Sequence, residues 1–376
     1  MSISPPLPAP PRQRVAVAMS GGVDSSVAAA WLLDQGYDVV GLTMRLWDHC
    51  ETESGGTTTN QRSCCGTEDV EDARRVAQTL NIPFYVLAMQ HRFEQDVVIP
   101  FVQDYAAGRT PNPCIRCNQI IKFQHLLEQA HALGAEFLAT GHYAQLLCSP
   151  GQPPRLFCGE DPRKDQSYFL ANTPWELLAK VRFPLGEVTK EETRRLAQQF
   201  GLHLAQKRES QDVCFVPDGD YRSFFRRRGL LDRPGPIRGV DGTVLGQHSG
   251  IHRYTIGQRK GLGISAPHPL FVIAMDISQN VLVVGPESAL YGKMARLYHL
   301  NWLVPDMNNR QHLEVMAKIR YASPPVSATL EFGGEKNGEA MIHFHAPQRA
   351  ITPGQACVFY QGRQVLGAGW IESVLG

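Results

Sequence analysis

The first half of the chain alternates short apolar runs with longer stretches in which apolar residues recur at helical spacing. Apolar runs bounded by turn residues are typical of buried strands, and spacings of three and four are typical of helices. The pattern predicts strands over residues 14–19, 38–46, 83–88 and 136–140 and helices over residues 25–35, 67–80, 92–107 and 115–133. Alternating strands and helices imply a doubly wound α/β fold, a parallel sheet with helices on both faces.

The second half has shorter apolar runs and more turns. One more helix is expected over residues 190–200, and a segment rich in Gly, Pro and Arg follows it. After about residue 267, alternating runs separated by turn residues are typical of a small β-barrel or sandwich. These runs are residues 271–275, 281–284, 328–332, 340–345 and 356–360.

These changes of pattern divide the chain into four parts. We expect a disordered proline-rich tail, an α/β domain, a small basic central domain and a C-terminal β-barrel domain, over residues 1–13, 14–217, 218–286 and 287–376. Inside the α/β domain, residues 48–61 are polar and hold Gly-Gly and three consecutive threonines. A mobile inserted loop is expected there.

Composition narrows the class of protein. The chain has 376 residues, of which 43% are hydrophobic and 19% charged, as in globular proteins with a sizeable core. No apolar run approaches the roughly 20 residues that span a bilayer. The start holds five prolines and no apolar stretch, which argues against a signal peptide. Nine cysteines, an odd number, favour a reducing compartment over a disulfide-bonded secreted protein.

Charge is unevenly distributed along the chain. The formal net charge is −5 for residues 1–181, +6 for residues 182–260 and zero for the remainder. The basic segment includes Arg226, Arg227, Arg228, Arg259 and Lys260. Such a segment beside an acidic domain is typical of a protein that binds a large polyanion. A solvated basic face without a partner would give the same charge pattern.

A glycine-rich loop, Ser-Gly-Gly-Val-Asp-Ser-Ser at residues 20–26, lies between the first predicted strand and helix. Glycine lets the backbone approach a phosphate closely, and a helix start favours negative charge. The loop has neither the Walker A nor the dinucleotide-binding pattern. It resembles the PP-loop of ATP pyrophosphatases, which cleave ATP to AMP and pyrophosphate. An ordinary Gly-Ser turn is the alternative.

A second informative stretch, at residues 112–118, holds Cys114 and Cys117. Pro113 favours a helix start there, and a helix start lowers the pKa of a nearby thiol. Cys214 follows Lys207 and Arg208 further along the chain. These thiols suit a zinc or iron–sulfur site completed by Cys214 or by Cys64 and Cys65, a redox pair, or simple packing. The remaining cysteines, assigned to packing, are Cys50, Cys148, Cys158 and Cys357.

Seven short motifs occur along the chain in an order that is specific to one protein family. They are residues 20–26, 112–118, 139–144, 164–170, 211–215, 255–263 and 352–355. Together they closely resemble the tRNA-specific 2-thiouridylase family, over nearly everything from residue 15 onward. The resemblance implies a cytoplasmic sulfurtransferase that replaces O2 of the wobble uridine of tRNA with sulfur, giving 2-thiouridine, AMP and pyrophosphate.

The resemblance also implies which residues carry the reaction. ATP activates the uridine by adenylation, with Mg²⁺ acting through Asp24. Cys214 matches the family's persulfide cysteine, and Cys117 matches the other catalytic cysteine, which forms a transient disulfide with Cys214. The implied ATP-binding residues are Ala18, Met19, Ser20, Gly21, Gly22, Val23, Asp24, Ser25, Met44 and Gly141.

Contacts with tRNA follow from the same resemblance. Basic side chains suit phosphates, and aromatic ones suit an extruded base. A sulfur-donor protein, either a cysteine desulfurase or a sulfur relay protein, is the second implied partner. The implied tRNA-binding residues are His142, Lys164, Asp165, Gln166, Arg320, Tyr321 and Gln355.

The chain departs from the family at Cys114, where some members have an Asp proposed as general base. Either another group or water then handles the proton, or Cys114, Cys117 and Cys214 hold an iron–sulfur cluster. Two other functions fit single features of the chain. A small-molecule ATP pyrophosphatase or ligase needs only the loop, and a zinc-stabilised RNA-binding protein needs only the Cys-x-x-Cys pair.

Overall fold

The computed structural model describes residues 13–46, 67–149, 151–207, 213–216, 219–305, 307, 310–332 and 338–375. The predicted tail before residue 13 and the predicted inserted loop at residues 48–61 lie outside this part of the chain, as do Cys50, Cys64 and Cys65. No helix within these ranges has the length and apolar character needed to cross a membrane.

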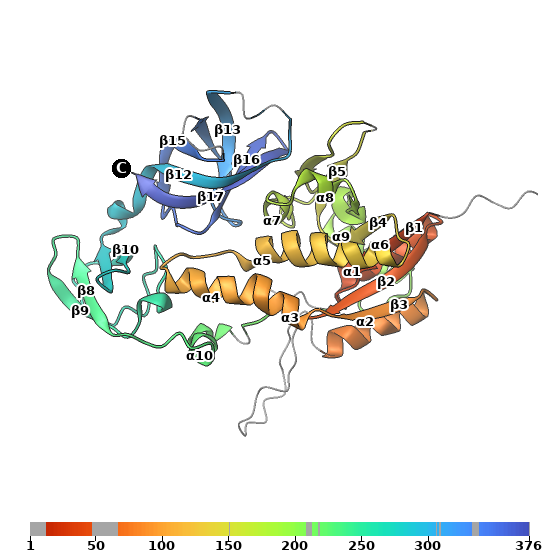
Figure 1. The fold of residues 1–376 in the computed structure, drawn as a ribbon, viewed down its shortest axis with the longest axis horizontal. Helices are drawn as coiled ribbons and strands as arrows, with labels where there is room; N and C mark the ends of the chain where they lie inside the picture. The colour runs from red at the N-terminus through yellow and green to blue at the C-terminus, as the bar shows by residue number, and fades with distance from the viewer. Residues whose placement is uncertain are drawn as a thin grey trace, which may run out of the picture.

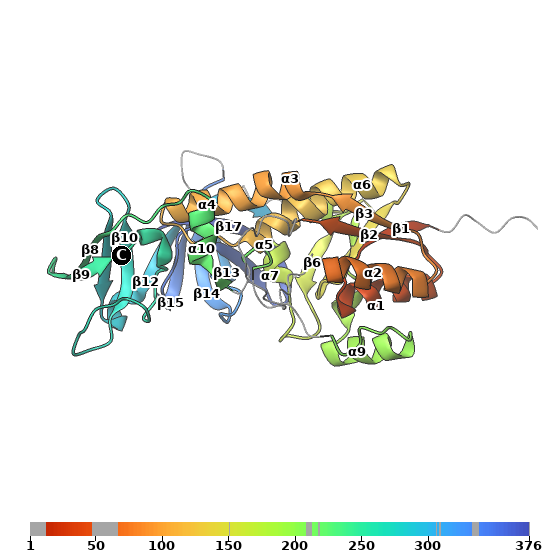
Figure 2. The ribbon, with the colours of Figure 1, turned by 90° about the horizontal axis from the view of Figure 1, so that it is seen from below.

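A five-stranded parallel sheet forms one end of the molecule (Figures 1 and 2). Its strand order is β3-β2-β1-β4-β7, and all four pairings are parallel. The strands are β1 (Arg14–Ala18), β2 (Asp38–Arg45), β3 (Phe84–Ala88), β4 (Phe137–Thr140) and β7 (Val181–Arg182). The predicted α/β fold is confirmed, although the sequence pattern missed the two-residue strand β7.

Helices cover both faces of this sheet because successive side chains of each strand point to opposite sides. On one face Val15 and Val17 pack in a core with α1 (Val23–Asp34), α2 (Thr67–Thr79) and α9 (Lys190–Gln199). On the other face Ala16 packs in the core that contains the helices after β3. Those helices are α3 (Gln90–Phe93), α4 (Ile99–Ala106), α5 (Pro113–Arg116) and α6 (Leu127–Ala132), with π-helical segments at Glu94–Val98 and Cys117–Leu126.

The middle of the chain forms a separate four-stranded sheet, in the order β10-β11-β8-β9. Figure 2 shows this sheet at the end of the molecule opposite α1 and α2. Ile237, Val272 and Leu282 are fully buried in its core. Its elements are α10 (Tyr221–Arg227), β8 (Gly235–Gly239), β9 (Val244–His248), a 3₁₀ turn (Ile251–Arg253), β10 (Phe271–Asp276) and β11 (Val281–Gly285). The sequence pattern missed β8 and β9.

The last part of the chain is a closed antiparallel β-barrel, as predicted. The barrel closes because its first strand pairs with its last, β12 with β17. Its strands are β12 (Tyr291–Trp302), β13 (His312–Lys318), β14 (Val326–Glu331), β15 (Ala340–Arg349), β16 (Ala356–Gln361) and β17 (Gln364–Leu375), preceded by a 3₁₀ turn (Glu287–Leu290). The predicted domain boundaries at residues 217 and 286 stay predictions.

A hairpin from the first half of the chain joins the barrel sheet. Its strands, β5 (Ala144–Leu147) and β6 (Arg155–Cys158), were not predicted, and β6 pairs with β17. Between β6 and α9 lie α7 (Ser167–Leu170), α8 (Trp175–Leu178) and a 3₁₀ turn (Pro184–Glu187). The barrel is therefore tied to the α/β part by backbone pairing.

Side-chain contacts strengthen this junction. The Tyr168 hydroxyl, on α7, donates to the Ala356 carbonyl at 2.9 Å, and both residues are fully buried. The Gln355 amide donates to the Thr110 carbonyl at 2.7 Å, and Thr110 N–H donates to the Pro353 carbonyl at 2.9 Å. The barrel thus holds the chain immediately before α5.

Replacing Tyr168 with Phe tests the junction. The change removes one buried hydrogen bond and should lower the free energy of unfolding by about 1 kcal/mol. Thermal and denaturant unfolding measure the loss. Tyr85→Phe, at an exposed tyrosine, is the matched control and should change stability by less than about 0.5 kcal/mol. Equal effects of the two changes would contradict a contribution of this bond to the junction.

Candidate functional site

A cavity of about 410 Å³ lies where β1, β2 and β4 end. Loops at the carboxyl ends of parallel strands are the usual ligand site of such sheets. Strand β1 contributes the glycine-rich loop, β2 contributes Met44, and β4 leads to Gly141 and His142. The lining residues are Ala18, Met19, Ser20, Asp24, Ser25, Leu42, Thr43, Met44, Leu46, Phe93, Val97, Pro113, Cys114, Cys117, Asn118, Lys122, Thr140, Gly141, His142, Gln166, Phe169, Val213, Cys214 and Phe215.

The glycine-rich loop has a conformation that only glycine permits at residue 21. Gly21 has φ +69°, and a Cβ there would lie 2.1 Å from the Asp69 carbonyl oxygen of α2. Lys207 completes this packing, since its ammonium donates to the Gly21 carbonyl at 2.9 Å and to Asp69 and Asp72 at 2.6 Å each. Burial opposes protonation of Lys207, but the two carboxylates outweigh it and raise the pKa of the ammonium.

The loop also holds itself together through its hydroxyl groups. The Ser20 N–H donates to the Ser25 hydroxyl at 3.1 Å, and the Ser26 hydroxyl donates to the Gly22 carbonyl at 2.8 Å. Helix α1 starts here and runs for 12 residues, so its free N–H groups and dipole favour an anion at the mouth of the loop. The close approach of Gly141 to Asp24 and Ser25 leaves no room for a side chain, because a Cβ would lie 2.7 Å from both backbones.

Asp24 is engaged inside the protein. The Lys190 ammonium lies 2.7 Å and 2.8 Å from its two carboxylate oxygens, and the Tyr143 hydroxyl donates to Oδ1 at 2.8 Å. The same hydroxyl lies 3.0 Å from the Thr193 hydroxyl, one turn beyond Lys190 in α9. No local sequence pattern reveals this network, because Lys190 and Asp24 are 166 positions apart.

The predicted thiols line the same cavity. Asn112 caps α5, where its side-chain oxygen accepts from Cys114 N–H at 3.2 Å and from Ile115 N–H at 3.4 Å. The predicted helix start is therefore confirmed, with Cys114 exposed and Cys117 half-buried at the first turns.

Cys214 lines the cavity, and the packing of its neighbour Phe215 holds this segment in place. Phe215 is only 2% exposed, and its ring lies 5.5 Å from Phe93, 5.1 Å from Phe101 and 5.5 Å from Phe224. Ring contacts of this kind add to the hydrophobic gain of burial. This aromatic cluster therefore fixes the chain next to Cys214 against the helices that follow β3.

His142 lies on the wall after β4. The Thr140 hydroxyl is 2.7 Å from its Nδ1, and the rings of Phe123 and Phe183 are 6.0 Å and 5.9 Å away. This apolar surrounding, and to a lesser extent the charge of Lys122, lowers the pKa of His142 well below its ordinary value. The imidazole is therefore neutral at neutral pH, with part of it facing the cavity.

The other predicted tRNA contacts are more scattered. Gln166 lines the cavity, and the Tyr321 ring lies 4.5 Å from that of Phe169, which also lines it. The Asp165 carboxylate holds the turn before α7, since it accepts the N–H groups of Gly159 and Ser167 at 3.0 Å each.

Two predicted contacts on the barrel side form bonds inside the protein. The Arg320 guanidinium donates to the Ala350 carbonyl and to the Thr352 hydroxyl, and Gln355 donates to Thr110 as described above. Neither residue lines the cavity. Lys164 also lies outside the lining, next to Asp165.

The cysteines assigned to packing differ from one another. Cys357 is fully buried, and burial raises the pKa of its thiol. Cys158 is half-buried, with the Ser167 hydroxyl 3.6 Å from its sulfur. Cys148 is exposed, so its assignment to packing was wrong. It sits at the end of β5, a strand that the sequence pattern did not reveal.

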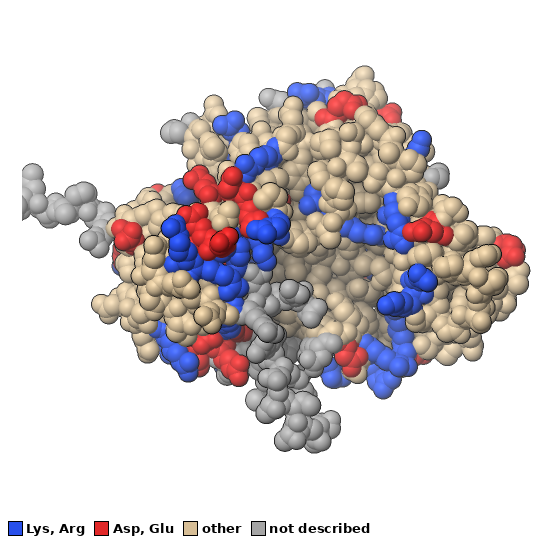
Figure 3. All heavy atoms as spheres, turned by 180° about the vertical axis from the view of Figure 1, so that it is seen from behind, with Lys and Arg blue, Asp and Glu red and all other residues tan. Residues whose placement is uncertain are grey.

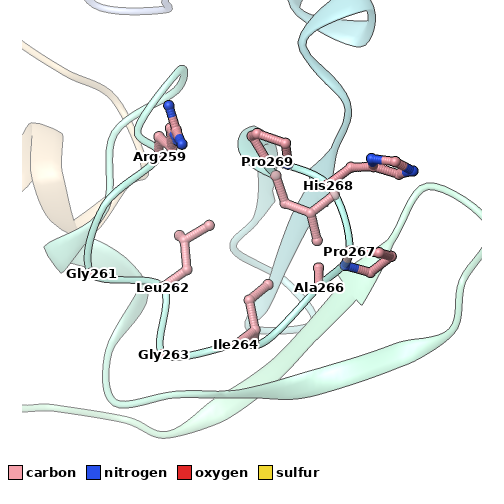
Figure 4. A pocket seen from close by; sticks show the side chains of 10 residues that line it. Arg259, Gly261, Leu262, Gly263, Ile264, Ala266, Pro267, His268 and Pro269 are labelled. Atoms are coloured by element: carbon pink, nitrogen blue, oxygen red, sulfur yellow. The ribbon is translucent and has the colours of Figure 1, made fainter.

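A second cavity, of about 440 Å³, lies in the basic central region (Figure 4). The loop from Arg259 to Leu270 encloses it, and Figure 4 shows Leu262 and Ile264 around the hollow with Arg259 at its rim. This loop includes residues 259–263, the end of the motif at residues 255–263. The loop belongs to the part of the chain that carries β8 and β9, at one end of the molecule (Figure 1), and shares no lining residue with the first cavity.

Comparison with known proteins gives three matching domain families. Their descriptions are tRNA methyl transferase HUP domain, tRNA methyl transferase PRC-barrel domain and aminomethyltransferase beta-barrel domain, over residues 13–218, 223–286 and 293–371. The fold and the site define the chain as an α/β protein of the HUP class fused to a β-barrel.

Full-length relatives are more specific. The chain is 58% identical to the tRNA-specific 2-thiouridylase MnmA of Magnetococcus marinus, over 96% of this chain and 99% of the relative. It is 46% identical to those of Geobacter metallireducens, over 97% and 98%, and Rickettsia massiliae, over 95% and 96%. The chain belongs to the tRNA-specific 2-thiouridylase MnmA family.

The neutral state of His142 predicts a pH dependence of stability. The unfolded chain binds a proton at this residue below about pH 6.5, whereas the folded protein does not until much lower pH. Stability should therefore fall as the pH drops from about 7.5 to about 5.5, more in the wild type than in His142→Gln. Denaturant unfolding at both pH values measures the difference. An identical loss in both proteins would contradict the lowered pKa of His142.

Proposed function

We propose that this protein is a tRNA 2-thiouridylase. It uses ATP to adenylate O2 of the wobble uridine of tRNA and then replaces that oxygen with sulfur from a cysteine persulfide. The observation that carries the proposal is a single cavity lined by Ser20, Asp24 and Ser25 of the glycine-rich loop and by Cys114, Cys117 and Cys214. A phosphate loop and thiols on one cavity suit a reaction that couples ATP cleavage to sulfur transfer.

The nucleotide would bind along the ends of β1, β2 and β4. The loop of residues 20–25 and the start of α1 suit the phosphates, since they offer N–H groups and a positive helix end. Met44 and Gly141 lie on the same cavity and suit the adenosine. Adenylation makes O2 a leaving group, and the uridine gives its N3 proton to water as the O2–phosphorus bond forms and pyrophosphate leaves.

The thiols would then carry out the sulfur step. The terminal sulfur of a Cys214 persulfide forms a bond to C2 as AMP leaves with the former O2. The Cys117 thiolate next attacks the inner sulfur of Cys214, which breaks the sulfur–sulfur bond and releases the thiouridine. Two thiols are oxidised to a disulfide, and the transferred sulfur is reduced. A thiol reductant and a sulfur-donor protein, a cysteine desulfurase or a sulfur relay protein, restore the persulfide.

Several residues suit contacts with tRNA. His142 and Gln166 line the cavity and suit the extruded base, while Lys164, Asp165, Arg320, Tyr321 and Gln355 lie outside the lining. On the face shown in Figure 3, lysine and arginine side chains stand along the edges of a hollow between the two halves of the molecule. Positive charge along such edges suits the binding of a polyanion such as tRNA. An enzyme that acts on tRNA would work in the cytoplasm.

The side chains at this site bear on two metal groups, a magnesium ion and an iron–sulfur cluster. A magnesium ion on Asp24 does not fit, because the Lys190 ammonium lies within 2.8 Å of both carboxylate oxygens. Cys114, Cys117 and Cys214 line the same cavity, but within the described ranges no three His, Cys, Asp or Glu side chains are grouped closely enough to hold a metal ion. No step is therefore assigned to a metal.

Nucleoside mass spectrometry after reaction with ATP, a persulfide donor and bulk tRNA tests the proposal. We expect exchange of oxygen for sulfur on the anticodon uridine. Cys117→Ser and Cys214→Ser should lower thiolation at least about hundredfold, because each removes a reacting sulfur. Both should still release pyrophosphate when tRNA is added, because adenylation needs no thiol.

Cys148→Ser, which changes an exposed thiol outside the cavity, should keep full activity and serves as the control. Pyrophosphate release without tRNA would indicate a small-molecule substrate instead. A methyl group on the tRNA, in place of sulfur, would contradict the proposal outright.

A further inference from the structure

The ion pair between Lys190 and Asp24 is built from several elements. The Lys190 side chain is only 9% exposed, and that of Asp24 is 29% exposed on the cavity wall. Helix α9 starts at Lys190, where the Thr189 hydroxyl caps the helix by accepting from Glu192 N–H at 3.2 Å. The nearly buried Asp161 carboxylate accepts the Lys190 N–H at 3.3 Å. These contacts hold the first turn of α9 against the glycine-rich loop.

The Tyr143 hydroxyl adds a second support. It joins Asp24 to Thr193, which is fully buried on the same helix. Figure 2 shows α9 next to α1, the helix that begins with the loop. Asp24 is therefore held by two side chains that come from outside its own loop.

The negative charge of Asp24 must be balanced if the cavity is to bind a phosphate. A carboxylate at the phosphate end of a nucleotide site repels the phosphates unless a cation neutralises it. A metal ion is one such cation, but Lys190 already lies against both oxygens of Asp24. A second cation at the same carboxylate would face the ammonium at short range in a partly buried place.

We propose that Lys190 is a positioning residue of the nucleotide site, whose ammonium takes the place of a metal ion as the counter-charge of Asp24. This inference rests on the proposed ATP site. Because Lys190 neutralises Asp24, the carboxylate adds no net negative charge to the glycine-rich loop. The N–H groups at the start of α1 then determine that the loop prefers anions. ATP phosphates then bind at the loop without a metal bridge to Asp24.

Direct binding of a non-hydrolysable ATP analogue to the full chain, with Mg²⁺ and with a chelator, tests this inference. Lys190→Met leaves an unpaired carboxylate and should weaken binding at least about tenfold. Lys190→Arg keeps the positive charge and should retain most of the affinity. The double variant Asp24→Asn/Lys190→Met has no carboxylate to neutralise, so it should bind better than Lys190→Met alone.

The metal dependence separates this role from a general effect on folding. The Mg²⁺ concentration that gives half-maximal binding should be the same for the wild type and Asp24→Asn, because Asp24 is not a metal ligand. Lys180→Met, at an exposed lysine outside the cavity, is the matched control and should bind as the wild type does.

The inference is overturned if Asp24→Asn abolishes the effect of Mg²⁺, or if the double variant binds no better than Lys190→Met. Either result with normal wild-type binding leaves the proposed function standing. A wild-type protein that binds no ATP analogue would overturn the proposed function together with this inference.

Discussion

The packing of Phe215 among aromatic rings is the interaction on which the site depends. Cys214 belongs to a segment far along the chain from the glycine-rich loop, and Phe215 fixes that segment against Phe93 and Phe101. The strand ends supply a phosphate loop from β1 and a wall from β4, but these alone would make an ordinary nucleotide site. With Cys214 added, the cavity also holds the chemistry for sulfur transfer.

The barrel supports the other thiols through the chain before α5. Thr110 is bonded through both its N–H and its carbonyl to the loop before β16, by Pro353 and Gln355. Asn112 then caps the helix start that carries Cys114 and Cys117. A polyanion that binds the barrel would thus contact a domain that is hydrogen-bonded to the segment carrying Cys114 and Cys117. Arg320 and Gln355 form hydrogen bonds inside the protein.

Much of this fold could be predicted from the sequence, because strong local patterns decide it. Alternating apolar runs predicted the parallel sheet, and the Gly-Gly loop and Pro113 marked two helix starts. Strand β7 has only two residues, which is too short for a pattern to show. The hairpin of β5 and β6 joins a sheet through β17, far along the chain, and local patterns do not reveal such a pairing. The pairing of Lys190 with Asp24 and the anchoring of Phe215 arise only from tertiary packing, which leaves no periodic signal. The hydrogen bonds of Arg320 and Gln355 also join residues far apart in the sequence, so no local pattern predicts them.

Peptide mapping of disulfides after a single turnover without reductant tests the central claim most directly. The enzyme would be loaded with persulfide, mixed with ATP and tRNA, alkylated and digested. The account predicts a bond between Cys117 and Cys214 that appears in step with 2-thiouridine and requires both ATP and tRNA, because only sulfurs within bonding reach can pair. Thiouridine formed while both thiols stay reduced, or a bond from Cys117 to Cys114 instead, would contradict it.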